Sequence, residues 1–330
     1  MAPPKEKSPK SDLIRPLEQL GGVKPPAPEW FEKAIATPAE EGVVTVKGAK
    51  IAYTAWGKKK CGRGLLFVHG GRAHRNWWRP FAPFFANDRR VAALDLSGMG
   101  DSDWRDQYSP DLLVDEVFAV IEAAGLDNGA RPVIVGHSFG GWVTLAAVER
   151  AGERLGGAVV VDSPLGVPDP DEGYTVVRAA TSDKPTGPQT GRVYARIEEP
   201  IMRFRLLPNQ PGEHLYLLDY IARQGLREAT APDGTPGWTW KFDPSKGKNF
   251  NISFERDLLR ASRCPLAFIY GEKSMFAAGD SLQHLRDQAR GRSPFIMMPE
   301  AYHHLMMDQP TAFVSVLRTL LSCWPVRFGV

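Results

Sequence analysis

The chain has 330 residues, 43% of them hydrophobic and 24% charged, so it can bury the core of one large domain or of one domain with an insertion. Its formal net charge of +3 is small beside 41 basic and 38 acidic side chains, which disfavours nucleic acid as a partner. The three cysteines, Cys61, Cys264 and Cys323, lack the spacing of a zinc site or a disulfide framework, which fits a reducing compartment.

The N-terminal residues 1–28 are rich in Pro, Lys and Ser, a composition that predicts a mobile tail. Charges and prolines stand where a secretory signal would need an apolar stretch, and no later segment offers about 20 uninterrupted apolar residues. We therefore expect a cytoplasmic protein without a membrane span, either a monomer or a homodimer.

A short helix and a β-hairpin are predicted after the tail. Residues 30–35 fit a helical turn or two, and residues 43–46 and 50–56 alternate around Lys47 and Gly48 as antiparallel strands do. The chain is thus expected to begin its sheet with an antiparallel pair.

From Leu65 onward the apolar residues form short continuous runs, which suit strands buried on both faces. These runs are residues 65–68, 91–94, 133–135 and 158–161. Helical patterns separate them, as at residues 110–122, where the acidic first turn suits a helix N-terminus. Strands that alternate with helices predict an α/β fold with a mostly parallel, doubly wound sheet.

The alternation stops at Pro164 and resumes with the apolar run at residues 265–270. The stretch between them is rich in Pro, Gly, Trp and Arg and has no clear strand runs, but helical patterns occupy residues 197–207 and 213–226. We expect a helical cap inserted after the sixth strand. The expected division is a core of residues 29–164 and 261–330 and a cap of residues 165–260.

The sequence Gly136-His137-Ser138-Phe139-Gly140 lies between the strand at 133–135 and a helical pattern at 141–148. A serine on such a turn is held in strained backbone geometry, and the flanking glycines leave room for the turn. The N-terminal dipole of the following helix points toward the negative charge that develops during acyl transfer. Ser138 is therefore the candidate nucleophile.

With this motif in its context, the chain resembles the α/β-hydrolase family over residues 43–325. The segment His69-Gly70-Gly71 resembles the family's His-Gly loop, which implies that the backbone N–H groups of Gly71 and Phe139 form an oxyanion hole; a plain glycine turn is the alternative. The family's turn at residues 95–102 normally shapes the sheet edge. The resemblance calls for no cofactor and no metal.

Near the C-terminus, residues 299–310 resemble the segment in which this family keeps its catalytic histidine, seven residues before a proline that opens the last helix. Counting back from Pro310 selects His303, and His304 is the competitor. An imidazole with a pKa of about 6.5 takes a proton from serine and returns it to a leaving group at neutral pH. A metal role for the adjacent pair is disfavoured, because neighbouring side chains on a loop rarely converge on one ion.

The triad acid is ambiguous. The family usually has Gly-x-x-Asp after the strand at 266–270, but here the sequence is Gly271-Glu272-Lys273-Ser274, and a serine supplies no anion. Asp162 follows the strand at 158–161 directly, where site residues of open α/β sheets collect, although a turn or helix-capping aspartate is the alternative. We expect Asp162 as the acid and Glu272 as its alternative.

The predicted activity is hydrolysis of a carboxylic ester or related acyl bond of a small molecule through an acyl-enzyme. Serine at the elbow disfavours haloalkane dehalogenase and epoxide hydrolase chemistry, which in this family uses a carboxylate there. A carbon–carbon bond hydrolase, a perhydrolase and a non-catalytic small-ligand binding protein remain as alternatives. In the predicted cap, Trp238 and Trp240 are candidates for either cap core or the wall of an acyl pocket. Four basic residues fit either a solvated helix face or contacts to an anionic substrate group: Arg192, Arg196, Arg203 and Arg205.

Overall fold

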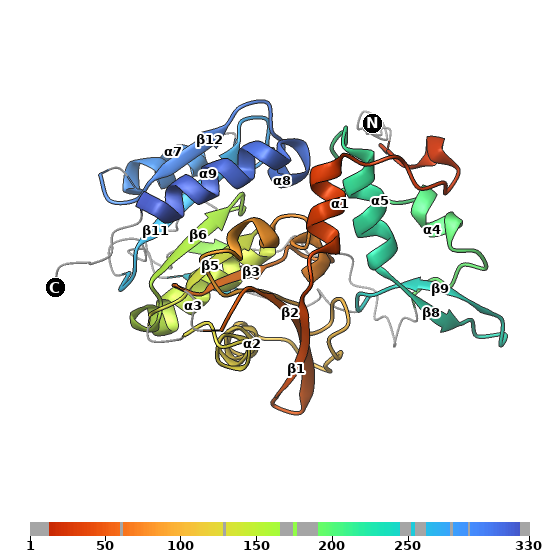
Figure 1. Cartoon of the computed structure of the whole chain (residues 1–330), viewed down its shortest axis with the longest axis horizontal. Helices are drawn as coiled ribbons and strands as arrows, with labels where there is room; N and C mark the ends of the chain where they lie inside the picture. The colour runs from red at the N-terminus through yellow and green to blue at the C-terminus, as the bar shows by residue number, and fades with distance from the viewer. Residues whose placement is uncertain are drawn as a thin grey trace, which may run out of the picture.

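The computed structural model describes residues 13–59, 62–127, 130–165, 174–176, 191–244, 252–254, 262–277, 280–289 and 291–323. An eight-stranded sheet with the order β1-β2-β4-β3-β5-β6-β11-β12 forms its centre (Figure 1). The strands are β1 Glu40–Val46, β2 Ala49–Trp56, β3 Leu65–Val68, β4 Val91–Leu94, β5 Val133–His137, β6 Gly157–Val161, β11 Leu266–Gly271 and β12 Phe295–Met298.

The first two strands form the predicted antiparallel hairpin, and β2 also pairs antiparallel with β4. Every other neighbouring pair in this sheet is parallel. The predicted α/β fold with a mostly parallel, doubly wound sheet is therefore confirmed.

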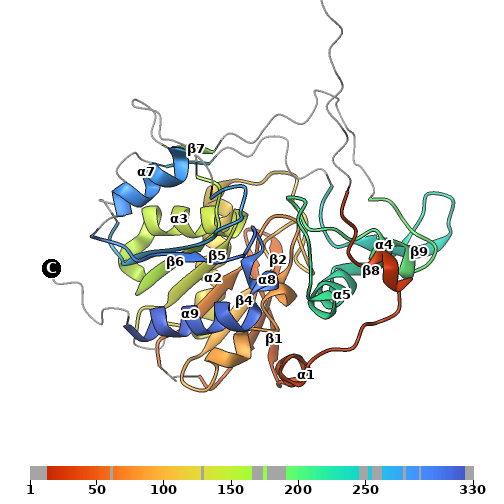
Figure 2. The same ribbon diagram turned by 90° about the horizontal axis from the view of Figure 1, so that it is seen from above.

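Helices cover both faces of the sheet. The helices α2, α3 and α7 pack on one face, and α9 packs on the other together with the 3₁₀ turns that follow β3 (Figure 2). Their bounds are α1 Glu29–Ala36, α2 Pro110–Ala123, α3 Phe139–Ala151, α7 Asp280–Ala289, α8 Leu305–Asp308 and α9 Pro310–Cys323, with 3₁₀ turns at Arg75–Trp77 and Ala82–Phe85.

The alternation of side chains explains why the strands read as continuous apolar runs. In β3, Leu66 and Val68 join the core beneath α2 and α3, whereas Leu65 and Phe67 join the core beneath α9. All four are fully buried, and burying one large apolar side chain contributes about 1.5–3 kcal/mol. With both faces covered, function is confined to the carboxyl edge of the parallel strands.

The segment between β6 and β11, described here over residues 191–244 and called the insertion, differs from the prediction of helices alone. Its helices are shorter than predicted, and it contains a hairpin whose turn places Gly234 at φ +88°. Asp233 and Gly234 favour such a tight turn, but no long apolar run flanks them to mark the strands. The elements of this region are α4 Glu198–Met202, α5 Leu215–Gln224, β8 Leu226–Thr230 and β9 Pro236–Trp240; β7 Tyr174–Val176 also pairs with β10 Ile252–Phe254.

Part of the predicted N-terminal tail is packed, so that prediction was wrong for residues 13–28. Leu17 is fully buried just before the 3₁₀ turn η1 Glu18–Leu20, and the N–H of Ile14 donates to Asn209 in the insertion at 3.1 Å. The guanidinium of Arg223 donates to the carbonyl of Gly22 at 2.7 Å. The prediction relied on the average composition of residues 1–28, which does not reveal that one leucine, Leu17, can anchor the segment. Residues 1–12 lie outside the described residues.

Within the described ranges, no helix combines the length and the hydropathy that crossing a lipid bilayer requires.

Candidate active site

Ser138 lies on the sharp turn between β5 and α3. Its backbone has φ 53° and ψ −118°, a left-handed region that side chains with a Cβ rarely adopt. A Cβ placed on Gly136 would lie 2.2 Å from the carbonyl oxygen of Gly140, and one on Gly140 would lie 2.5 Å from that of His69. The two flanking glycines thus allow the turn that presents Ser138 at the carboxyl edge of the sheet.

Three predicted site residues from distant parts of the chain form one hydrogen-bonded chain. The Ser138 Oγ lies 3.0 Å from Nε2 of His303, and Nδ1 of His303 lies 2.9 Å from Oδ1 of Asp162. Asp162 is fully buried at the end of β6, and His303 is 2% exposed in the loop before α8. The first distance suits proton transfer from the serine hydroxyl to His303, and the second suits a hydrogen bond through which the carboxylate stabilises the imidazole.

Additional donors surround the carboxylate of Asp162. The backbone N–H of Gly271 donates to Oδ2 at 2.7 Å, and the hydroxyl of Ser274 donates to Oδ1 at 2.6 Å. Ser274 stands where the resemblance implies an acid, and it supports the carboxylate that comes from β6 instead. The alternative acid, Glu272, is exposed and accepts the backbone N–H of Glu300 at 3.0 Å.

Burial sets the protonation states in this chain of residues. Desolvation lowers the pKa of His303 below its usual range, so its imidazole is neutral and able to accept a proton at neutral pH. Burial raises the pKa of Asp162, while the hydrogen bonds from Ser274 and Gly271 favour its carboxylate and lower the pKa.

Two further buried histidines adjoin His303. The Nε2–H of His137 donates to the carbonyl of His303 at 3.0 Å, and that of His304 donates to the carbonyl of Leu207 at 3.1 Å. One ring nitrogen from each of the three histidines lies within 4.8 Å of the others, so a metal ion bound there would compete with the hydrogen bonds of His303. No role was predicted for His137, whose place beside Ser138 is its only signal in the sequence.

The insertion holds the histidine loop through Gln210, which is 4% exposed. Its Oε1 accepts the backbone N–H of His304 at 3.0 Å, and its Nε2 donates to Asp308 at 3.0 Å. Asp308 in turn accepts the N–H of Tyr302 at 2.8 Å. Gln210 was not predicted from the sequence, because no local pattern connects it to a loop 94 residues later.

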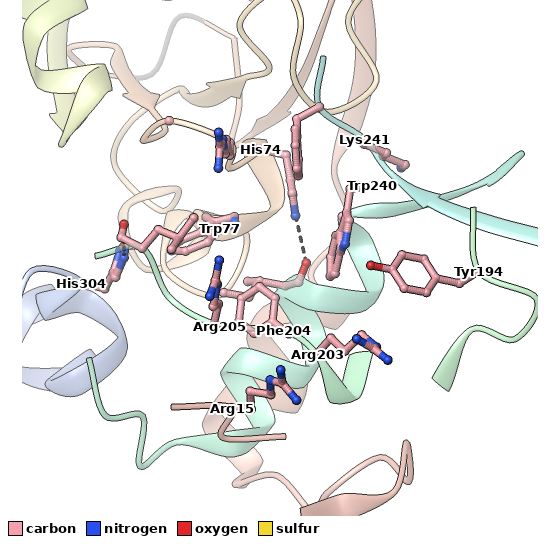
Figure 3. A pocket seen from close by; sticks show the side chains of 16 residues that line it. Arg15, His74, Trp77, Tyr194, Arg203, Phe204, Arg205, Trp240, Lys241 and His304 are labelled. Carbon is pink, nitrogen blue, oxygen red and sulfur yellow. Dashed lines mark hydrogen bonds between the residues drawn. The ribbon is translucent and has the colours of Figure 1, made fainter. Parts of the chain in front are cut away.

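Two adjoining cavities open beside Ser138. The first, of about 350 Å³, is lined by Ser138, Phe139 and Gly71, and a Cβ on Gly71 would lie 3.6 Å from the Cβ of Phe139. The backbones of the two expected oxyanion-hole residues are therefore neighbours next to the serine. The second cavity, of about 360 Å³, is lined by Trp240 (Figure 3). Trp238 pairs with Tyr194 and lines neither cavity.

Buried neutral histidines should make the fold sensitive to acid. Burial lowers the pKa of His74 to about 4 and of His137 to about 3, and it lowers that of His304 well below its ordinary value, so these rings bind protons mainly on unfolding. Burial raises the pKa of Asp308 to about 6, so this carboxyl group releases a proton on unfolding and offsets the proton taken up by one of the three histidines. The pKa of His303 is lowered and that of Asp162 is raised, so the proton that His303 takes up on unfolding is offset by the one that Asp162 releases. The net two protons predict a loss of about 3 kcal/mol in unfolding free energy per pH unit between pH 6 and 4.

Urea titrations at pH 6, 5 and 4 measure this slope. The variant His74→Gln keeps a donor for the carbonyl of Ile221 but removes one titrating ring, so its slope should be smaller by about 1.4 kcal/mol per pH unit. Equal unfolding free energies at pH 6 and pH 4 for the unmodified protein would contradict the prediction.

Comparison with known proteins agrees with this architecture. Residues 65–316 match the family model described as the alpha/beta hydrolase family. A haloalkane dehalogenase of Sphingobium indicum is 33% identical over 129 residues, which are 38% of this chain and 42% of that protein. A 2-hydroxymuconate semialdehyde hydrolase of a Pseudomonas species is 36% identical over 104 residues, which are 30% of this chain and 36% of that protein. The chain thus matches less than half the length of these curated relatives.

Among solved structures, the thioesterase domain from the curacin biosynthetic pathway superimposes with a TM-score of 0.66. The match covers 86% of this chain and 100% of that domain at 18% identity, which shows the fold alone. Because the family model spans most of the chain, this protein belongs to the alpha/beta hydrolase family.

Proposed function

We propose that this protein cleaves a carboxylic ester, or a related acyl bond, of a small molecule through an acyl-enzyme on Ser138. The observation that carries the proposal is the hydrogen-bonded chain from Ser138 through His303 to Asp162, with distances of 3.0 and 2.9 Å. In this arrangement His303 has its acceptor nitrogen toward the serine, because its Nδ1–H donates to the carboxylate.

In the first half-reaction, Ser138 Oγ forms a bond to the carbonyl carbon while His303 takes the hydroxyl proton. The backbone N–H groups of Gly71 and Phe139 stabilise the resulting oxyanion. The imidazolium of His303, stabilised by Asp162, then gives its proton to the departing alcohol oxygen. In the second half-reaction a water attacks the acyl-enzyme, His303 takes the water's proton, and the acid leaves as the proton returns to Ser138.

A serine nucleophile favours acyl transfer over the alkyl-transfer chemistry of dehalogenases. Attack of Ser138 on an alkyl carbon would give a stable ether, whereas attack on an acyl carbon gives an ester that water can cleave. The similarity to a 2-hydroxymuconate semialdehyde hydrolase makes carbon–carbon bond cleavage the second candidate, with the same nucleophile and base. We take the insertion as a cap, because Leu207 and Pro208 line the cavity that contains Ser138.

The decisive experiment combines active-site labelling with turnover. A fluorophosphonate probe should label Ser138, and a series of p-nitrophenyl acyl esters from acetate to dodecanoate should reveal the preferred chain length. The matched control is Ser138→Ala, which should give neither labelling nor turnover. Binding of ligands without turnover by the unmodified protein would instead identify a non-catalytic binding protein.

A further inference from the structure

The cavity beside the proposed acyl site is cationic. Its lining contains Arg15, Arg72, Arg203, Arg205 and Lys241 but no aspartate or glutamate (Figure 3). It adjoins the cavity of Ser138, because Gly71, Arg72, Leu207 and Phe242 line both. A molecule bound at the serine can therefore extend directly into a positively charged space.

Three of these cations have no anionic partner among the described residues. Lys241 pairs with Asp101 at 2.6 Å, and Arg15 pairs with Glu18 at 3.4 Å. In contrast, Arg72, Arg203 and Arg205 form no ion pair within the described part of the chain.

The three arginines line the cavity from two separate segments, and all three are exposed. Arg203 and Arg205 follow α4 in the insertion, whereas Arg72 follows the expected oxyanion-hole residue Gly71. The backbone of Arg72 has φ 60°, and its N–H donates to the sulfur of Met99 at 3.1 Å, which fixes where this side chain begins. Because these positive charges line one cavity without an ion-pair partner among the described residues, they favour a bound anion, and guanidinium groups match the geometry of carboxylate or phosphate oxygens.

Two buried histidines also form part of the wall of this cavity. His74 and His304 both line it, and each is 5% exposed. The Nε2–H of each donates to a backbone carbonyl, at 3.0 Å to Ile221 and at 3.1 Å to Leu207. Each Nδ1 is buried without a partner among the described residues, and burial lowers the pKa of both rings. The neutral rings therefore add no positive charge to this wall.

We propose that the substrate carries an anionic oxygen group, a carboxylate or a phosphate, which binds among Arg72, Arg203 and Arg205 while its acyl carbon lies at Ser138. The inference rests on the proposed function for the position of the acyl carbon; the anion site itself stands on the arginines.

Substrates of equal length but different charge test the inference in the unmodified protein. For p-nitrophenyl esters, kcat/KM should be about tenfold higher for the monoester of adipic acid than for the hexanoate, because exposed charge pairs contribute modestly. The 6-aminohexanoate ester should be the poorest of the three. The preference for adipate should shrink in 0.5 M NaCl, since salt screens exposed charges.

Matched variants locate the effect. The double variant Arg203→Gln and Arg205→Gln should lose most of the adipate preference while hydrolysing the neutral hexanoate normally. Arg196→Gln is the control: this arginine belongs to the same insertion and is exposed, but it pairs with Glu198 and lines neither cavity. Equal losses in both variants would overturn the assignment.

A binding measurement separates this inference from the proposed function. Calorimetry on Ser138→Ala should detect adipate or glycerol phosphate, whichever chemistry the site prefers, and should not detect neutral hexanediol. Turnover of esters without a preference for charge, together with no anion binding, overturns the anion site but leaves the hydrolase proposal standing. Anion binding without ester turnover supports the anion site but overturns the hydrolase proposal.

Discussion

Replacing Asp162 with asparagine should lower kcat by about 10⁴ while the protein remains folded, as expected when a triad carboxylate is lost. Three donors converge on this side chain, from His303, Ser274 and the N–H of Gly271. An amide has only one acceptor oxygen, so at least one donor would face an NH₂ group, and His303 would lose control of its tautomer. Steady-state hydrolysis of a p-nitrophenyl ester measures the loss, and circular dichroism reports the fold.

The matched control is Glu272→Gln, which should keep kcat within about twofold, because substitution of an exposed side chain outside the hydrogen-bonded triad has little effect. Glu272 is exposed, and its carboxylate accepts a hydrogen bond from the backbone of Glu300. If Glu272→Gln abolished turnover while Asp162→Asn did not, the acid would belong to the loop after β11 and our assignment would fail.

Replacing His303 with asparagine should have a larger effect, a fall in kcat of about 10⁶, because one residue performs every proton transfer in both half-reactions. His304→Asn is the informative comparison, since the two rings are adjacent and both are buried. The asparagine at position 304 retains a donor for the carbonyl of Leu207, so we expect a change in kcat of about tenfold or less.

Both variants should also be treated with a fluorophosphonate probe. Slow labelling of Ser138 in His303→Asn, with labelling near the normal rate in His304→Asn, would separate activation of the serine from damage to folding. The reverse order would move the base to His304. Urea denaturation of both variants is the control for folding, because a buried polar group left without a hydrogen bond lowers the unfolding free energy by about 1–3 kcal/mol.

The sequence alone determined the features that depend on local patterns. Short apolar runs such as residues 65–68 predicted the buried strands, because a strand covered on both faces needs apolar residues at every position. The elbow around Ser138 is equally local: a strand, a glycine-flanked serine and a helix follow one another within a few residues. The fold class and the candidate nucleophile therefore follow from short stretches of sequence.

The third residue of the hydrogen-bonded chain is ambiguous in the sequence, because Asp162 and Glu272 follow neighbouring parallel strands, β6 and β11, whose carboxyl ends meet at one edge. Which side chain reaches His303 depends on contacts 141 residues apart, and on Ser274 and Gly271 surrounding one carboxylate with donors. Adjacency along the sheet brings both acids near the site, but it does not determine their orientation.

The contacts of the insertion with the rest of the protein depend almost wholly on tertiary structure. Gln210 fixes the histidine loop, Leu17 anchors the N-terminal segment, and Arg72, Arg203 and Arg205 line one cavity. None of these relations has a periodic signature, because each joins irregular segments far apart in the chain. The sequence determined the sheet and the elbow through repeated local chemistry, whereas only the packed chain decided which charges and donors face the serine.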